Sequence, residues 1–152
     1  MNNPLDLKFT GGCQCGAVRY EVRAPLEMVH YCHCRMCQRA VGNAFALIAG
    51  APRDKLSWVR GMPRLFNSSS LATRGFCNEC GTPLTFGYHE SMFTYLTIGS
   101  LDHPEMVTPE RHYGIESAIP WLHIDDDLPR ETTPDDPRYL AMVVHQHALP
   151  VS

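Results

Sequence analysis

The chain consists of short apolar runs that are separated every few residues by glycine, proline or clusters of polar residues. In residues 17–22 apolar and polar side chains alternate, which places Val18, Tyr20 and Val22 on one face of a half-buried strand. Residues 44–49 form a continuous apolar run, as expected of a strand buried on both faces. Many short strands joined by glycine and proline turns predict a mainly β domain of the sandwich or barrel type.

The same pattern predicts the remaining elements. Further strands are expected at residues 5–9, 28–31, 56–59, 64–66, 82–86, 93–98 and 121–124. Little helix is expected: a turn at residues 35–40, a short helix with Asp102 as its N-cap, and a terminal helix within residues 136–147. A segment rich in proline and charge begins at Pro129, so we expect a domain of residues 1–129 and a C-terminal tail of residues 130–152.

Length and charge narrow the class of protein. A chain of 152 residues suits one domain with a sizeable core. The formal net charge is −3 and no basic patch stands out, which argues against a nucleic-acid partner. No apolar run approaches the roughly 20 residues of a membrane-spanning helix, and the first ten residues do not resemble a secretory leader. We therefore expect a reducing, cytoplasmic location with no membrane partner.

All seven cysteines lie in three clusters, which are Cys13 and Cys15, then Cys32, Cys34 and Cys37, then Cys77 and Cys80. Thiols that serve as small hydrophobic side chains would be scattered singly along the chain. Spacings of one or two residues rarely give the Cβ separation that a relaxed disulfide needs. The clusters therefore predict shared metal sites, and thiolate ligands at these spacings are typical of zinc.

Seven thiolates divide most naturally into a group of three and a group of four. The central triad, Cys32, Cys34 and Cys37, lies within six consecutive positions and is compact enough to hold one ion by itself. Cys13, Cys15, Cys77 and Cys80 are then left for the other ion, beside glycines that allow tight turns around sulfur. Four thiolates form a closed structural zinc site, whereas three leave one position open for a substrate.

Three motifs surround these cysteines, namely Gly12-Cys13-Gln14-Cys15-Gly16, Cys32-His33-Cys34-Arg35-Met36-Cys37 and Thr73-Arg74-Gly75-Phe76-Cys77-Asn78-Glu79-Cys80-Gly81. Later segments continue the pattern at Gly99-Ser100-Leu101-Asp102, Arg111-His112, Pro120-Trp121 and Asp126-Asp127-Leu128-Pro129. Together they resemble the glutathione-dependent formaldehyde-activating enzyme family, which includes centromere protein V-like proteins. The resemblance implies an Mss4-like, zinc-bound β domain of short antiparallel strands. It also implies a structural zinc at the four-cysteine group and, at the triad, a second zinc where glutathione adds to formaldehyde to give S-hydroxymethylglutathione.

The residues of the triad support the same chemistry. Zinc with three protein ligands is a Lewis acid with one open position, and a thiol that coordinates it loses its proton. Addition of a thiol to an aldehyde forms a carbon–sulfur bond without a redox cofactor. We therefore expect a carbon–sulfur lyase-type enzyme whose partners are a small-molecule thiol and an aldehyde. Arg35 and Arg39 are the cations closest to the triad in the sequence, and are the candidates to bind the substrate's carboxylates.

Two alternatives use the same cysteines. In the first, the triad is a second closed zinc site whose fourth ligand is His30, His89 or His112, and the protein is a non-catalytic zinc module or a thiol carrier. In the second, Cys34 and Cys37 act as a redox-sensing dithiol that releases zinc on mild oxidation.

Two further histidines near the motifs have expected roles. His33 lies between two cysteines on an extended segment, so its side chain should point away from a metal that both cysteines bind. His112 is the better candidate for proton transfer, because a histidine titrates near neutral pH. His145 and His147 have no third ligand nearby and are not assigned to a metal, and Trp121 is expected in the core.

Overall fold

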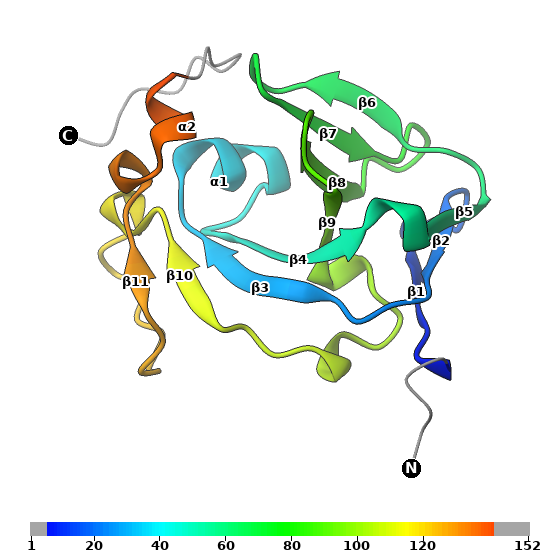
Figure 1. The fold of residues 1–152 in the computed structure, drawn as a ribbon, viewed down its shortest axis with the longest axis horizontal. Coiled ribbons are helices and arrows are strands. Elements are labelled where there is room, and N and C mark those ends of the chain that lie inside the picture. The colour runs from blue at the N-terminus through cyan, green and yellow to red at the C-terminus, as the bar shows by residue number, and fades with distance from the viewer. Residues whose placement is uncertain (1–5, 142–152) are drawn as a thin grey trace.

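The computed structural model describes residues 6–141, in which eleven strands form two sheets (Figure 1). The strands are β1 Phe9–Gly12, β2 Arg19–Val22, β3 Glu27–Cys32, β4 Ala46–Pro52, β5 Leu56–Arg60, β6 Arg64–Asn67, β7 Ala72–Phe76, β8 Pro83–Tyr88, β9 Phe93–Thr97, β10 Arg111–Tyr113 and β11 Arg130–Glu131. The helices are α1 Arg35–Val41 and α2 Pro137–Leu140. Short 3₁₀ turns occur at Arg53–Lys55, Ile98–Ser100, Pro104–Met106, Ile115–Ser117 and Thr133–Asp135.

The larger sheet has eight strands in the order β11-β10-β3-β4-β9-β8-β7-β6, and the smaller has three in the order β1-β2-β5. The pairings are antiparallel except at β10, which runs parallel to both β3 and β11. Figure 1 shows α1 in the space between the two ends of the larger sheet, with β10 and β11 on one side and β7 and β8 on the other. The predicted mainly β fold of short strands with little helix is confirmed.

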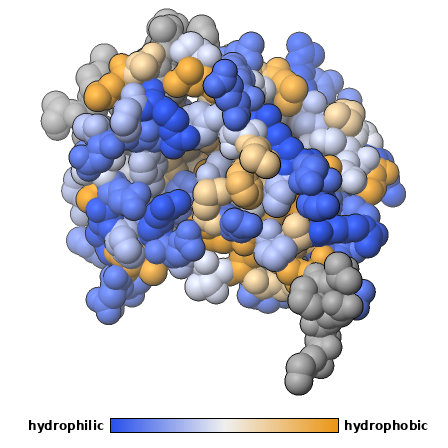
Figure 2. Space-filling model, viewed as in Figure 1, coloured by the Kyte–Doolittle hydropathy of each residue, from blue (hydrophilic) through white to orange (hydrophobic). Residues whose placement is uncertain are grey.

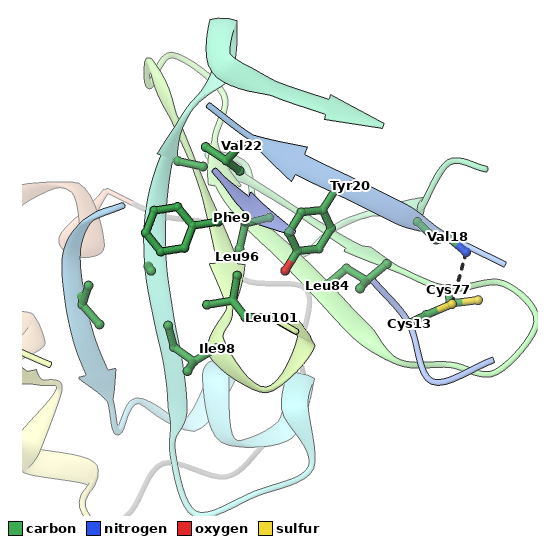
Figure 3. Close-up of a cluster of buried hydrophobic side chains, with 13 residues drawn as sticks. Phe9, Cys13, Val18, Tyr20, Val22, Cys77, Leu84, Leu96, Ile98 and Leu101 are labelled. Atoms are coloured by element: carbon green, nitrogen blue, oxygen red, sulfur yellow. Dashed lines mark hydrogen bonds between the residues drawn. The ribbon is translucent and has the colours of Figure 1, made fainter. Parts of the chain in front are cut away.

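The main core lies between the two sheets (Figure 3). Val18, Tyr20 and Val22 are 3%, 0% and 0% exposed, so the alternating face predicted for residues 17–22 is buried as expected. Burial of side chains of this size stabilises the fold by roughly 1.5–3 kcal/mol each. The hydroxyl of Tyr20 is satisfied inside the core, because it bonds to Ser100 Oγ at 2.7 Å while Ser100 donates to a backbone carbonyl.

The turn predicted at residues 35–40 is the helix α1, which begins as predicted and ends one residue later. Cys34 is its N-cap, and the Sγ of this residue accepts a hydrogen bond from the backbone N–H of Cys37. Gly42 ends the helix with a φ of 65°, a left-handed conformation that glycine adopts without strain. Two of the three triad cysteines are therefore fixed by the first turn of a helix.

Several predicted elements differ in the structure. Residues 121–124 do not form a strand, and Trp121 is 72% exposed rather than in the core. Asp102 does not cap a helix; its carboxylate accepts hydrogen bonds from Thr10 and Arg19. The first strand begins at Phe9, later than predicted.

The C-terminal part of the described chain packs against the sheet. β11 pairs with β10, and the carboxylate of Glu116 accepts hydrogen bonds from Thr133. The hydroxyl of Tyr113 donates to Asp136 at 3.1 Å. The expected boundary at residue 129 stays a prediction. The predicted terminal helix corresponds to α2, and the rest of it, with His145 and His147, lies outside the described residues.

The surface shown in Figure 2 has apolar residues at the centre of the face and mainly hydrophilic residues around them. No helix within residues 6–141 combines the length and the apolar character needed to cross a bilayer.

Candidate functional site

The four-cysteine group assembles from two turns that are far apart in the sequence. Cys13 and Cys15 lie between β1 and β2, and Cys77 and Cys80 lie between β7 and β8. The four sulfur atoms lie within 4.8 Å of one another, so the pairing of clusters predicted from the sequence is the one in the structure. Gly16 and Gly81, which follow the two pairs, have φ values of 80° and 78°. This left-handed backbone lets both turns fold tightly around the sulfurs.

The geometry of the four-cysteine group suits a tetrahedral ion. Zinc–sulfur bonds of about 2.3 Å place the sulfurs of a tetrahedral site about 3.8 Å apart. The Sγ atoms of Cys13 and Cys15 are 3.6 Å apart, and those of Cys15 and Cys77 are 3.8 Å apart. Hydrogen bonds from Thr82 lower the pKa of Cys80 to about 5. The donor set therefore fits a thiolate-bound metal.

The triad lies at the junction of β3 and α1. Cys32 ends β3, Cys34 is the N-cap of α1, and Cys37 lies in its first turn; all three are buried. The Sγ atoms of Cys32 and Cys34 are 3.4 Å apart, and the three sulfurs lie within 4.8 Å of one another. Gln38 fixes the turn, because its Nε2 donates to the backbone oxygens of His33 and Ser117. The triad also fits a shared metal ion.

Arg74 is the cation at the triad. It lies on β7, which is on the opposite side of the curved sheet from β3, and its Nη2 donates to Cys37 Sγ at 3.4 Å. Its guanidinium carbon lies 4.8 Å from the centre of the Phe86 ring. Hydrogen bonds from Cys32 and Cys34, together with the charge of Arg74, hold the pKa of the Cys37 thiol well below its ordinary value.

A cavity of about 430 Å³ opens beside the triad. Its walls come from both ends of the larger sheet and from the segment after β11. Charged residues of both signs line it, namely Arg74, Arg111, Arg138, Glu131, Asp135 and Asp136. A cavity of this size and composition suits a small molecule with several polar or charged groups.

The arginines on the cavity wall are held in place by their neighbours. Arg138 bonds to Asp136 at 3.0 and 3.1 Å and lies over the Tyr88 ring, 4.2 Å from its centre. Arg111 lies 3.9 Å from Glu131. Arg111 and Arg138 are therefore both paired with acids of the same wall.

Arg35 and Arg39, the cations predicted from the sequence, lie elsewhere. The guanidinium of Arg35 donates to Gln38 Oε1 and lines a shallow hollow beside Trp121. Arg39 is exposed and lines that hollow and a second cavity next to the triad. Neither residue lines the 430 Å³ cavity.

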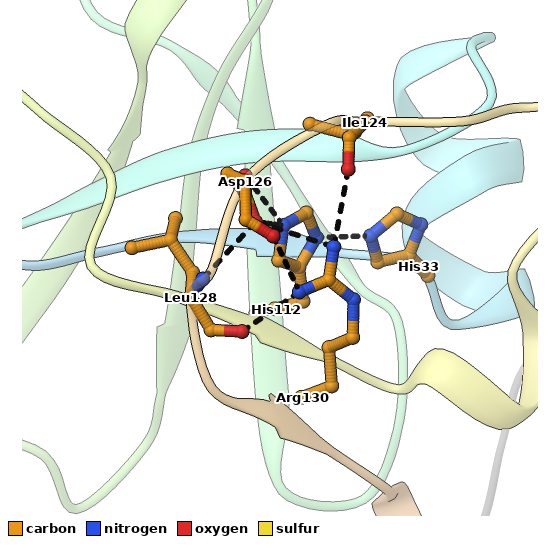
Figure 4. Close-up of polar contacts among 6 residues, drawn as sticks. All are labelled: His33, His112, Ile124, Asp126, Leu128 and Arg130. Carbon is orange, nitrogen blue, oxygen red and sulfur yellow. Dashed lines mark hydrogen bonds and ion pairs between the residues drawn. The ribbon is translucent and has the colours of Figure 1, made fainter.

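Behind the triad, two buried histidines and the half-buried Asp126 form a polar chain (Figure 4). His33 Nε2 lies 2.8 Å from His112 Nδ1, and His112 Nε2 lies 3.0 Å from the carboxylate of Asp126. Since a carboxylate only accepts, we assign the proton on Nε2 of His112 to the bond with Asp126, and His33 then donates to His112. Both imidazoles are buried, at 4% and 2% exposed. The chain anchors the backbone between Cys32 and Cys34.

No histidine in the described part of the chain joins the triad's three sulfurs as a fourth group within 4.8 Å. His112 is paired with His33 and Asp126, and His89 lies 3.0 Å from Thr73. His30 lines the cavity, and its Nδ1 is bonded to the backbone oxygen of Met28 at 2.7 Å. Among residues 6–141, therefore, the triad has three candidate ligands and a cavity on its open side.

The sequence did not point to Arg74, Arg111 or Arg138. Arg74 lies inside the motif that ends in Cys77 and Cys80, so its position in the sequence associates it with the other cysteine group. Its contact with the triad depends on the curvature of the sheet, which places β7 opposite β3. The signal in the sequence that could have pointed to Arg74 was its place as the single cation within a cysteine motif.

Comparison with known proteins agrees with these features. The model of a family described as "Glutathione-dependent formaldehyde-activating enzyme" matches residues 8–117. A Schizosaccharomyces pombe protein described as an uncharacterized lyase is 28% identical over 81 residues, which are 53% of this chain and 58% of that protein. A Halomonas elongata protein named for glutathione-dependent formaldehyde activation is 27% identical over 126 residues, with 76% of this chain and 80% of that protein covered.

A solved structure also resembles the fold. A Rhodobacter sphaeroides protein, known from a crystal structure, matches with a TM-score of 0.52 and 29% sequence identity. The match covers 66% of this chain and 91% of that one.

Proposed function

The chain belongs to the glutathione-dependent formaldehyde-activating enzyme family, and from that premise we propose that it adds a glutathione-type thiol to a small aldehyde such as formaldehyde. The reaction is of the carbon–sulfur lyase type, and it takes place at the triad of Cys32, Cys34 and Cys37. The observation that carries the proposal is the triad itself: three buried sulfurs within 4.8 Å of one another, next to a cavity of about 430 Å³.

We assign a zinc ion to each cysteine group. Cys13, Cys15, Cys77 and Cys80 hold the first, which ties the β1–β2 turn to the β7–β8 turn and so closes a long loop. Cys32, Cys34 and Cys37 hold the second. An ion with three thiolate ligands supplies Lewis acidity and one open position. The spacing of the sulfurs in both groups supports this assignment.

The carbon–sulfur bond forms between the substrate thiolate and the aldehyde carbon. The carbonyl oxygen takes up the proton that the thiol loses, so the product is a hemithioacetal and no electrons are gained or lost overall. Arg74 is placed to stabilise the negative charge that develops at the reacting atoms, because its guanidinium already contacts Cys37 Sγ. The three cysteines are buried, and charges interact more strongly in such surroundings than in bulk water.

The charges of the cavity wall match those of a zwitterionic thiol. Glutathione carries two carboxylates and one ammonium group, and the wall offers cations and acids for both. We propose that Arg111 and Arg138 bind the carboxylates, in preference to Arg35 and Arg39, which do not line this cavity. The acids at Glu131 and Asp135 are available to the ammonium group.

The chain's seven cysteines are all free of disulfides in the structure, which suits thiolates that bind metal in a reducing compartment. A cytoplasmic location stays a prediction.

The proposed thiol binding is tested by calorimetric titration of the zinc-loaded protein with glutathione in buffers of different ionisation heat. Binding as a thiolate releases a proton, so the apparent affinity is expected to rise with pH below the pKa of free glutathione. Arg138→Met should weaken binding by about 1.5–3 kcal/mol through loss of a charged hydrogen bond, with zinc content unchanged. Binding without any acceleration of adduct formation would mean a thiol carrier, and no binding of any small thiol would reject the proposed function.

A further inference from the structure

A second cavity, of about 470 Å³, adjoins the first. The two share five lining residues, namely Met36, Ile48, Ser68, Arg74 and Phe86. Met36 and Phe86 also pack against the buried cluster that contains the three triad cysteines. The second cavity therefore lies beside the first, and Arg74 belongs to the lining of both.

The two cavities differ in chemistry. Acidic residues and three arginines line the first, whereas none of the described residues that line the second is acidic. Its apolar walls are formed by Val41, Ala46, Phe66, Phe76 and Pro83, in addition to the shared Ile48 and Phe86, and its polar residues besides the arginines are Ser68, Thr85 and Thr97. Arg39 is its exposed basic residue at the surface end of α1. The first cavity suits a charged thiol, and the second suits an apolar group.

Formaldehyde has no carbon chain and leaves such a space empty. A volume of about 470 Å³ lies within the range of about 300–1,000 Å³ typical of cavities that enclose whole ligands. An aldehyde whose carbonyl carbon meets the thiol near Arg74 would direct its remaining carbons into the second cavity. Removal of those carbons from water then favours binding.

We propose that the second cavity receives the apolar carbon chain of a larger aldehyde, so that the site accepts medium-chain or aryl aldehydes in addition to formaldehyde. The inference rests on the proposed function and specifies its aldehyde substrate. The reaction balances as before: the thiol sulfur bonds to the carbonyl carbon, and the thiol proton ends on the carbonyl oxygen.

The first test compares aldehydes of increasing length with glutathione and the zinc-loaded, full-length protein. Exchange between free aldehyde and hemithioacetal is followed by NMR for formaldehyde, propanal, butanal, pentanal and hexanal, each against a control without protein. The kcat/KM is expected to rise about fourfold for each added methylene, the gain expected from burial of one CH₂. A kcat/KM that stays constant or falls with chain length overturns the inference. Acceleration with formaldehyde would in that case still support the proposed function. No acceleration with any aldehyde overturns both.

The second test fills the cavity. Val41 is half-buried at the end of α1 and lines only the second cavity, so Val41→Trp should lower the hexanal-to-formaldehyde ratio of kcat/KM by about tenfold or more. Val59→Trp is the matched control, because Val59 is 57% exposed and lines neither cavity. The same fall in both variants would overturn the inference.

A third test substitutes partly exposed residues and measures ligand binding instead of the reaction rate. Phe66 is 49% exposed at the rim, so Phe66→Asp should fold and should disfavour an apolar chain. Its matched control is Leu65→Asp, at a neighbouring position that is 64% exposed and outside the cavity. Binding of hexan-1-ol, an unreactive analogue of the chain, is measured by NMR shift perturbation without thiol. Weakening by Phe66→Asp alone supports the inference, and equal binding in all three proteins contradicts it.

Discussion

Arg74 Nη2 lies 3.4 Å from Cys37 Sγ, although the two residues belong to strand β7 and helix α1 and are 37 positions apart. This contact brings a cation from one end of the curved sheet to the thiolates at the other. A group of three thiolates around a divalent ion carries net negative charge, which weakens the ion as a Lewis acid. Arg74 offsets that charge.

Removal of this cation is therefore expected to lower activity without unfolding the domain. In Arg74→Met the side-chain length is kept and the charged hydrogen bond is lost, at a cost of about 1.5–3 kcal/mol, or about 10- to 150-fold in kcat/KM. The measurement is the rate of hemithioacetal formation beside the melting temperature and zinc content. Arg64→Met, on the exposed strand β6, is the matched control and should behave like the unmodified protein. Equal rates for all three proteins would remove Arg74 from the mechanism.

The four-cysteine group is expected to hold the fold together. Cys80 is exposed, so Cys80→Ser removes little packing and mainly removes a metal ligand. Binding of structural zinc contributes on the order of 10 kcal/mol to folding, and the variant is expected to be insoluble or to lose its cooperative thermal transition. Ser57→Ala, at an exposed position of β5, serves as a folding control. An unchanged melting temperature in Cys80→Ser would contradict the assignment of this group as structural.

The triad is expected to be separable from that framework. Cys34→Ser should leave a folded protein that retains one zinc ion per chain and loses the other, as measured by elemental analysis and circular dichroism. The reason is that the triad's ligands lie within a single segment and close no long loop. Loss of both ions, or an unfolded chain, would place the triad in the structural framework and favour the closed-site alternative.

Disruption of the polar chain behind the triad is expected to lower the stability of the fold without removing a metal ligand. His112→Leu leaves the buried ring of His33 without its hydrogen-bond partner, and a buried group left in this way costs about 1–3 kcal/mol, whereas Asp126 keeps Leu128 and Arg130 as partners. Denaturation by urea should show this loss at an unchanged slope. His103→Leu is the control, because His103 is exposed and bonds only to the exposed Glu105. A loss in the free energy of unfolding no larger than that of the control would show that the polar chain of His33, His112 and Asp126 does not stabilise the fold.

Much of the fold could be predicted because its signals are local. The alternation of Val18, Tyr20 and Val22 determines which face of β2 is buried, and Gly42 stops α1 through its own conformation. The grouping of the cysteines could also be predicted, because ligand spacing and flanking glycines constrain each turn.

The remaining features depend on pairing between distant segments. β10 forms as a three-residue strand because it pairs with β3 and β11, and its own sequence has no strand pattern. Asp102 was predicted as a helix cap from its neighbours, but Arg19 and Thr10 on the smaller sheet bind its carboxylate. Proximity in sequence suggested Arg35 and Arg39 as substrate cations, whereas the curvature of the sheet brings Arg74 to the triad.

The central claim is that the triad with its metal accelerates the addition of a thiol to an aldehyde. The most direct measurement is exchange NMR of glutathione and formaldehyde with catalytic amounts of the zinc-loaded protein, since this method separates the protein's contribution from the spontaneous reaction. The account predicts faster exchange in proportion to protein concentration, and a return to the spontaneous rate in folded Cys34→Ser that keeps only the four-cysteine zinc. Exchange at the spontaneous rate with the fully zinc-loaded protein, or equal acceleration by Cys34→Ser, would contradict it.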